Sequence, residues 1–158
     1  MRILISSDHA GFELKQKLIP FLEHFKYEVE NKGAFEFDAN DDYPDLVEPV
    51  AREVSNNPNT VRGIVIGGSG QGEAIVANRF PHVRAVVFNG QYSPRDGHNV
   101  PHEITISREH NNSNILSLGA RFLSDEDAKK AVRTWLETEF TGEERHVRRL
   151  KKIDGIKP

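Results

Sequence analysis

The chain has 158 residues, of which 37% are hydrophobic and 28% are charged, and its formal net charge is −3. This length predicts one domain with a substantial core, and the balanced charge gives no general attraction to nucleic acid or to membranes. Because the chain has no cysteine, disulfides, thiolate metal sites and thiol nucleophiles are excluded. The apolar stretch before Asp8 is too short for a secretory signal or a membrane span, so we expect a soluble, cytoplasmic protein.

Short apolar runs alternate with helical patterns along the chain. Strands are expected at 2–6, 27–33, 63–67, 84–88 and 114–119, and helices at 11–25, 43–55 and 124–140, with a further helix beginning late after 84–88. This order predicts an α/β fold, a doubly wound five-stranded parallel sheet with helices on both faces in three Rossmann-like layers. Ligands bind such sheets at the carboxyl ends of the strands. Four strand exits here are polar or glycine-rich: "SSDHAG", "GGSGQGEA", "FNGQYS" and "LGARFL".

The most unusual exit is "GGSGQGEA", residues 67–74. Glu73 stands where a dinucleotide fingerprint has its third glycine, and where a nucleotide triphosphate loop has its lysine, so both nucleotide sites match poorly. Free main-chain N–H groups at the start of the next helix could hold an oxyanion while Glu73 removes a proton from the adjacent carbon. Alternatively, Glu73 only complements the dipole of that helix.

Other strand exits also carry polar side chains. Asp8 and His9 follow the first strand directly, and His9 is either structural or part of a site at that edge. Tyr43 follows an acidic run, residues 38–42, which is expected to be mostly a solvated loop, and Tyr43 could close over a ligand.

The segment around the fifth strand adds three further candidates. His110 can move protons between oxygens at neutral pH. Asn111 could orient His110 or bind a hydroxyl, although it can also be an ordinary turn residue. Arg121, just past the strand, is placed for an anion such as a phosphate ester.

The C-terminal segment is strongly basic, and a helix is expected over about residues 142–153. On it Arg145, Arg148 and Arg149 share one face. They could form a phosphate clamp, which a neighbouring subunit could use, or a solvated helix end that favours cations. A nucleic-acid patch is disfavoured by the negative net charge and by the lack of interleaved aromatic residues.

Five blocks of the sequence together resemble the ribose-5-phosphate isomerase B family of sugar-phosphate isomerases (RpiB/LacAB). They are "SSDHAGFELK", "DDYPD", "GIVIGGSGQGEAIVANRFPHVRA", "REHNNSNILSLGAR" and "RHVRRL". The resemblance covers 1–158 nearly end to end as a single domain. It implies a doubly wound α/β sheet, no metal or organic cofactor, and a homodimer or tetramer with active sites between subunits, with the basic C-terminal helix reaching the partner.

The resemblance also implies a reaction, the interconversion of ribose 5-phosphate and ribulose 5-phosphate. One branch of the family uses a cysteine in the glycine loop as the base, and this chain has Gly67 at that place. It is similar instead to the branch known from mycobacteria, whose loop reads G-G-S-G-x-G-E. Alternatives are an isomerase of a six-carbon sugar phosphate, such as allose or galactose 6-phosphate, and a sugar-phosphate-binding protein without catalysis.

Carried over to this sequence, the family's pattern gives each candidate residue a role. Glu73 moves the proton between C1 and C2, and the loop residues Gly68, Ser69, Gly70 and Gly72 bind and stabilise the enediolate. His110 opens the furanose ring, Asp8 and Asn111 bind sugar hydroxyls, and Tyr43 lies near the sugar. The phosphate is held by His9 and Arg121, with Arg145, His146 and Arg149 from the partner subunit.

One segment departs from the family's pattern. Between "AVVF" and "REHN" the chain has "NGQYSPRDGHNVPHEITIS", which is several residues longer than expected. The segment follows a strand next to the predicted site, so it could reshape the sugar pocket. Its His98 and His102 are expected to be surface residues.

Overall fold

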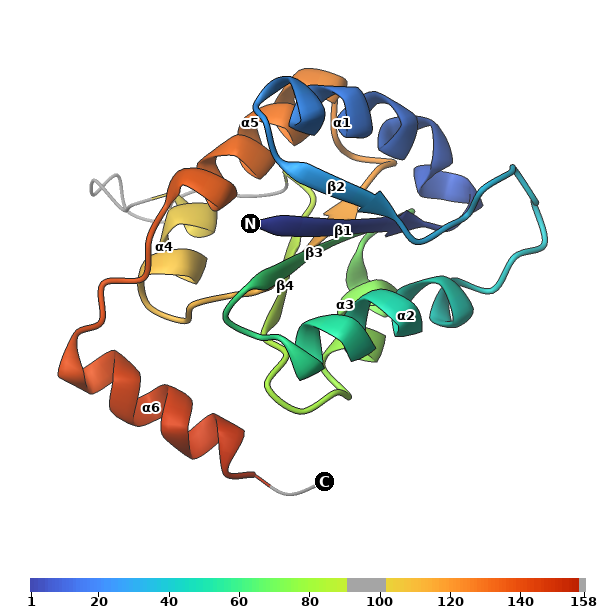
Figure 1. The fold of residues 1–158 in the computed structure, drawn as a ribbon. Helices are drawn as coiled ribbons and strands as arrows, with labels where there is room; N and C mark the ends of the chain where they lie inside the picture. Colours follow the sequence, from blue (N-terminus) through green and yellow to red (C-terminus); the bar gives the residue numbers. More distant parts are fainter. Residues whose placement is uncertain (91–101, 157–158) are drawn as a thin grey trace.

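The computed structural model describes residues 1–90 and 102–156 (Figure 1). Its strands are β1 (Arg2–Ser7), β2 (Glu28–Asn31), β3 (Val61–Gly67), β4 (Ala85–Phe88) and β5 (Ile115–Gly119). Its helices are α1 (Phe12–His24), α2 (Tyr43–Asn56), α3 (Gln71–Ala77), α4 (Glu103–Glu109), α5 (Asp125–Glu137) and α6 (Glu144–Asp154), with a 3-10 turn at His9–Gly11 before α1. The predicted elements are therefore all present, in the predicted order.

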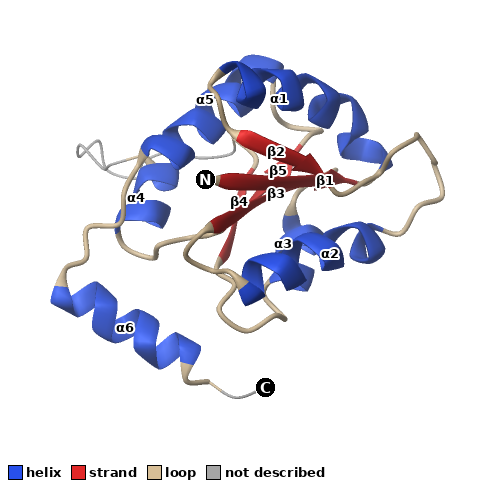
Figure 2. Ribbon diagram, viewed as in Figure 1, coloured by secondary structure: helices blue, strands red, loops and turns tan. Residues whose placement is uncertain are grey.

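The strands form one parallel sheet in the order β2-β1-β3-β5-β4. Helices α1 and α5 cover one face and α2 and α3 cover the other (Figure 2). The predicted doubly wound, three-layer fold is confirmed.

Side chains of the central strands point alternately to the two faces of the sheet, and this explains why helices cover both faces. Ile64 and Ile66 of β3 belong to the apolar cluster that contains Trp135 of α5, whereas Val65 between them belongs to the cluster that contains Val50 of α2. Successive strand residues point to opposite faces, so a strand that is apolar at every position needs helices on both sides.

Helix α4 begins late in the segment that is longer than the family's pattern. His102, which is exposed as expected, is its N-cap, and its Nδ1 accepts the N–H of Ile104 at 3.3 Å. His98 lies outside the described residues. In the last turn of α4, the buried Arg108 donates to the carbonyl oxygens of Thr138 (3.2 Å) and Ser113, which fixes the turn into β5. Arg108 therefore has a structural role.

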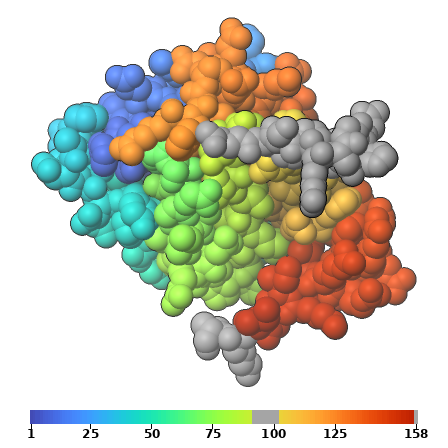
Figure 3. Space-filling model, turned by 180° about the vertical axis from the view of Figure 1, so that it is seen from behind, coloured from blue at the N-terminus to red at the C-terminus, as the bar shows by residue number. Residues whose placement is uncertain are grey.

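Helix α6 stands apart from the three layers and forms a ridge along one side of the molecule (Figure 3). Only His146 and Leu150 of this helix are buried. Most of its other side chains are charged and exposed.

The central strands end at the same edge of the sheet. Ser7 of β1 pairs with Ile66 of β3, and Gly67, the last residue of β3, pairs with Gly119, the last residue of β5. The segments that follow these three strands are thereby brought together.

Candidate active site

A cavity of about 270 Å³ opens where β1, β3 and β5 end. It is lined by Asp8, His9, Tyr43, Gly68, Ser69, Gly72, Glu73, Arg121 and Phe122. Eight of these nine are residues that the sequence singles out, and they come from three strand exits and the start of α2. The convergence of parallel strand ends is what assembles them.

Glu73 lies in the first turn of α3 and is only 4% exposed. A Cβ atom placed on Gly67 would overlap the Glu73 carboxylate, so this carboxylate occupies the space directly beside the end of β3. The glycine at position 67 is therefore the reason that an acid can lie inside the turn rather than point to solvent.

Burial raises the pKa of Glu73, and the negative charge of Asp8 raises it further, while the N–H of Glu73 itself lowers it. Burial also raises the pKa of Asp8, against the hydrogen bond that its Oδ1 accepts from the N–H of Gly11 at 3.0 Å. A carboxylate with a raised pKa is a stronger base, and in a cavity this is typical of a group that transfers protons.

The loop before α3 presents main-chain groups beside this carboxylate. Gly70 has a φ of +78°, in the left-handed region that favours glycine, and its carbonyl accepts the hydroxyl of Ser117 at 2.6 Å. Among the described residues, the N–H groups of Ser69 and Gly70 have no protein acceptor. Ser69 lines the cavity, whereas Gly70 is buried directly behind it in the loop.

His9 and Arg121 give the cavity its positive charge. His9 Nδ1 lies 2.6 Å from Asp41 Oδ1, and this hydrogen bond raises the pKa of His9. Arg121 lies over the loop, with its Cζ 3.1 Å from the position that a Cβ on Gly68 would take. Two cationic side chains beside a carboxylate suit a substrate that carries an anionic group away from its reacting carbon.

Asp41 and Phe122 are two residues of this site that the sequence analysis missed. The expectation of a solvated acidic run is wrong for Asp41, whose side chain is 12% exposed because it packs against His9. Phe122, 51% exposed, lies at the cavity beside Arg121. A single phenylalanine after a strand carries no signal that separates a ligand contact from a core residue.

Tyr43 closes the α2 side of the cavity. Its Cζ lies 2.7 Å from the position that a Cβ on Gly72 would take, so the ring rests on the main chain of the loop. Pro44 stands at the start of α2, where its ring is tolerated, and helps to begin the helix at Tyr43.

The remaining predicted site residues do not line this cavity. They are Gly70, in the loop beside the cavity, and five residues that lie elsewhere in the chain, namely His110, Asn111, Arg145, His146 and Arg149. His110 caps the end of α4 and stacks on His146 of α6, and Asn111 is exposed at an apolar groove beside β4. Arg145 and Arg149 are exposed on α6. Within one chain, the structure gathers these residues into a second group.

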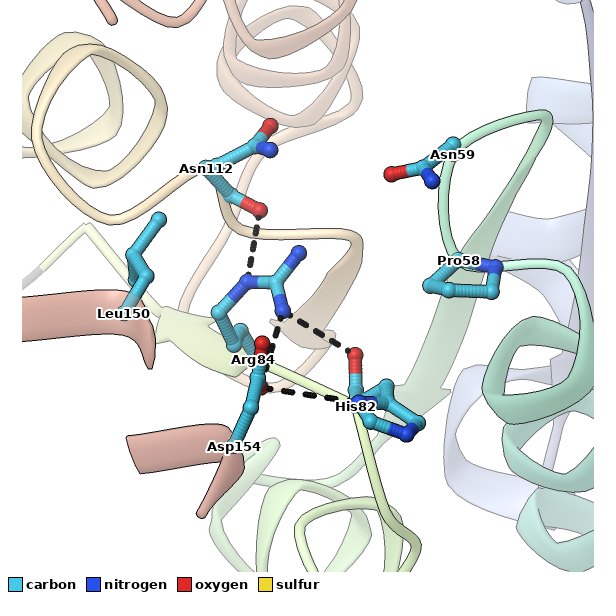
Figure 4. Close-up of a pocket in the computed structure, with 7 residues that line it drawn as sticks. All are labelled: Pro58, Asn59, His82, Arg84, Asn112, Leu150 and Asp154. Atoms are coloured by element: carbon cyan, nitrogen blue, oxygen red, sulfur yellow. Dashed lines mark hydrogen bonds and ion pairs between the residues drawn. The ribbon is translucent and has the colours of Figure 1, made fainter. Parts of the chain in front are cut away.

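A cavity of about 360 Å³ at the opposite, amino-terminal edge of the sheet contains none of the predicted site residues (Figure 4). Arg84 crosses it, donating to the carbonyl oxygens of Asn112 (3.1 Å) and His82 (3.3 Å) and lying 3.4 Å from Asp154 of α6. This cavity is the place where the end of α6 meets the body of the protein.

Two kinds of site are not found in the part of the chain that the structure describes. Residues 1–90 and 102–156 contain no group of three or more His, Cys, Asp or Glu side chains arranged to hold a metal ion. Within the same ranges, no helix has the length and apolar character needed to cross a bilayer.

Residues 3–153 match the model of a protein family described as Ribose/Galactose Isomerase. The ribose-5-phosphate isomerase B of Mycolicibacterium paratuberculosis is 37% identical over 150 residues, which are 95% of this chain and 87% of that protein. The chain belongs to the ribose/galactose isomerase family. It is thus an aldose–ketose isomerase, as the sequence blocks imply.

Solved structures of the same family share the isomerase's fold. The ribose-5-phosphate isomerase B of Mycoplasma genitalium, with bound ribulose-5-phosphate, superposes with a TM-score of 0.87 at 35% identity and covers 97% of this chain and 93% of that chain. The Clostridium thermocellum enzyme gives a TM-score of 0.84 at 40% identity and covers 98% of this chain and 95% of that chain.

Proposed function

We propose that this isomerase interconverts ribose 5-phosphate and ribulose 5-phosphate, with Glu73 as the base. The observation that carries the proposal is the buried Glu73 carboxylate, which lies against Gly67 in a cavity that also holds His9 and Arg121. Relatives named for ribose 5-phosphate support the choice of substrate, and one of them was solved with ribulose-5-phosphate.

The reaction needs one base that can face two neighbouring carbons. In the open-chain aldose, the Glu73 carboxylate takes the proton from C2, the C–H electron pair forms the C1=C2 double bond, and the aldehyde oxygen takes the negative charge. The N–H groups of Ser69 and Gly70 then stabilise the enediolate. A proton passes from O2 to O1 and Glu73 returns its proton to C1, which gives the ketose.

The other side chains of the cavity hold the sugar phosphate in place for this transfer. Asp8 accepts a hydrogen bond from a sugar hydroxyl, and Tyr43 packs beside the chain of carbons. His9 and Arg121 bind the phosphate, and the hydrogen bond from His9 to Asp41 raises the pKa of the imidazole, which favours its charged form.

We infer that the second group of residues reaches this cavity from a partner subunit. His110 opens the furanose ring, Asn111 binds a hydroxyl, and Arg145 and Arg149 add to the phosphate site. In a two-fold symmetric homodimer each subunit can give its second group to the other, which makes two equivalent sites. The exposed arginines on α6, which lies outside the three layers of its own subunit, support this arrangement.

The variant Glu73→Gln tests the base. It keeps the shape of the side chain but cannot take a proton, so kcat should fall by about 10²–10⁴-fold while the Kd for ribose 5-phosphate stays close to the wild-type value. Turnover is followed as ribulose 5-phosphate formed, and exchange of the C2 hydrogen with deuterated water should be lost.

Glu126→Gln is the matched control for this test. Glu126 is another glutamate in the first turn of a helix, but it is exposed and outside the cavity. If Glu73 only complemented a helix dipole, the two variants would behave alike. A Glu73→Gln enzyme with near-normal kcat would exclude Glu73 as the base.

A six-carbon substrate is the second candidate, because the family description covers galactose as well as ribose. Measuring kcat/KM for ribose 5-phosphate beside allose 6-phosphate and galactose 6-phosphate decides between them. A higher value with a six-carbon sugar would overturn the assigned substrate and leave the role of Glu73 standing. Binding of all three without turnover would indicate a sugar-phosphate-binding protein.

A further inference from the structure

The residues of α6 that the family resemblance assigns to the phosphate differ in their surroundings. Arg145 and Arg149 are exposed, whereas His146 is only 3% exposed. A ligand of phosphate has to present a polar atom to the site, so His146 needs a separate explanation.

The ring of His146 is packed against the ring of His110. The two ring centroids lie 4.3 Å apart and the planes are inclined by only 11°, which is a stacked pair. The Nε2 atom of His146 is buried and has no hydrogen-bond partner among the described residues, with the nearest Glu143 oxygen 3.9 Å away. A phosphate oxygen could not reach this nitrogen unless the ring left the stack.

The charge state of His146 also fits a packing role. Burial lowers its pKa most, His110 and Arg145 lower it further, and the opposing effect of Glu143 is smaller than each of these three. The ring is therefore held neutral. A neutral imidazole is a poor ligand for a phosphate dianion, but it offers a flat face to a second ring.

Contacts at both ends hold α6, and hence His146, against the body of its own chain. Just before the helix, the N–H and hydroxyl of Thr141 donate to the carbonyl oxygen of Glu109, at 3.2 Å and 2.9 Å. In its last turn, Asp154 lies 3.4 Å from Arg84 (Figure 4). An acid at a helix C-terminus opposes the helix dipole, so the ion pair with Arg84 explains why Asp154 stands there.

We propose that His146 is a positioning residue, whose buried ring fixes the orientation of the His110 imidazole, and that it does not bind the phosphate. The inference rests on the role proposed above for His110 in opening the sugar ring. Through the stack, α6 supplies arginines for the phosphate on its exposed face and a support for His110 on its buried face.

Two substitutions separate stacking from phosphate binding. His146→Phe keeps a flat ring but no polar atom, so kcat with ribose 5-phosphate should stay within about threefold of wild type. His146→Leu fills a similar volume without a flat ring, so kcat should fall by about 10–100-fold because His110 is no longer held. In both variants KM, and the Ki for inorganic phosphate as competitive inhibitor, should stay within about twofold of wild type.

Arg149→Ala is the benchmark for a lost phosphate contact, and it should raise KM and the phosphate Ki by about tenfold. His24→Phe, at an exposed histidine on α1, controls for the substitution itself. The inference is overturned if His146→Phe raises the phosphate Ki as Arg149→Ala does, or if His146→Leu keeps the wild-type kcat. Failure of the proposed function is a distinct result, namely a wild-type protein without isomerase activity, and calorimetric titration of His146→Phe with inorganic phosphate would still decide whether His146 binds it.

Discussion

The cavity holds two carboxylates with different surroundings. Burial raises the pKa of both, and a main-chain N–H opposes it in both, that of Glu73 itself for Glu73 and that of Gly11 for Asp8. The charge of Asp8 then raises the pKa of Glu73 further, whereas His9 lowers the pKa of Asp8. A raised pKa makes Glu73 a stronger base. In the proposed mechanism, the pKa of Glu73 sets the acid limit of the reaction.

Asp8→Asn should move the acid limb of kcat/KM to lower pH. The base works only when it is ionised, so activity is lost as the pH falls through the pKa of Glu73. Removing the negative charge of Asp8 lowers that pKa, because one of the causes that raise it is gone. Because Asp8 is also proposed to bind a sugar hydroxyl, the maximum of kcat/KM should fall too, and the pH at the midpoint of the acid limb is the measurement. A limb that stayed in place or moved to higher pH would contradict the coupling.

Asp41→Asn tests the support of His9. The hydrogen bond that His9 donates to Asp41 is the main cause that raises the pKa of His9, so the variant should lose the charged imidazole at a lower pH than wild type. We expect KM for ribose 5-phosphate to rise by about three- to tenfold at neutral pH and to change little in acid, where His9 is protonated in both proteins. A KM that rose equally at every pH would show that Asp41 acts through the shape of the loop.

At the scale of the elements, β3 and α3 meet at a turn that has room for one side chain. The Glu73 carboxylate fills the space where residue 67 would carry a Cβ. A side chain at 67 and an acid at 73 therefore exclude one another at this turn. This is a physical reason for the two branches that the family resemblance implies, one with its base at position 67 and one with its base at position 73.

Gly67→Ala should test this exclusion. The added methyl overlaps the Glu73 carboxylate, and a displacement of about 1 Å is enough to lower kcat by about 10²-fold. Gly67→Ala should also lower the Tm in the wild-type background and much less in a Glu73→Ala background, where the space is free. Equal Tm losses in the two backgrounds would mean that the methyl meets something other than Glu73.

The sequence predicts the position of some site residues but not of others. Asp8, His9, Ser69 and Arg121 directly follow strands that an apolar run identifies, so their convergence follows from the sheet alone. Asp41 lies in a long connection between β2 and α2, and its contact with His9 depends on the path of that connection. No local pattern encodes such a path.

Helix α6 shows the same limit of sequence-based prediction. The sequence predicts its basic face. The burial of His146 on His110, however, depends on the path of the chain between α5 and α6 and on the packing of α6 beside α4. The spacing of Arg145, His146 and Arg149 groups all three as one clamp, and only the packing separates the histidine from the arginines.

At the scale of the whole molecule, the proposed active site needs two chains. In that proposal one subunit supplies Glu73 and its cavity, and the other supplies His110 and the arginines of α6. The charged ridge of α6 and the incomplete cavity are then two halves of one site, related by the symmetry of a homodimer.

The most direct test is a dimer built from two inactive chains. Glu73→Gln and His110→Ala subunits with different affinity tags are expressed together, and dimers that carry both tags are purified and assayed with ribose 5-phosphate. In such a dimer one site combines an intact Glu73 with an intact His110 and the other has neither, so about half of the wild-type turnover per dimer should return. If the mixed dimer were as inactive as the two parent homodimers, the active site would not be shared between subunits in the way described.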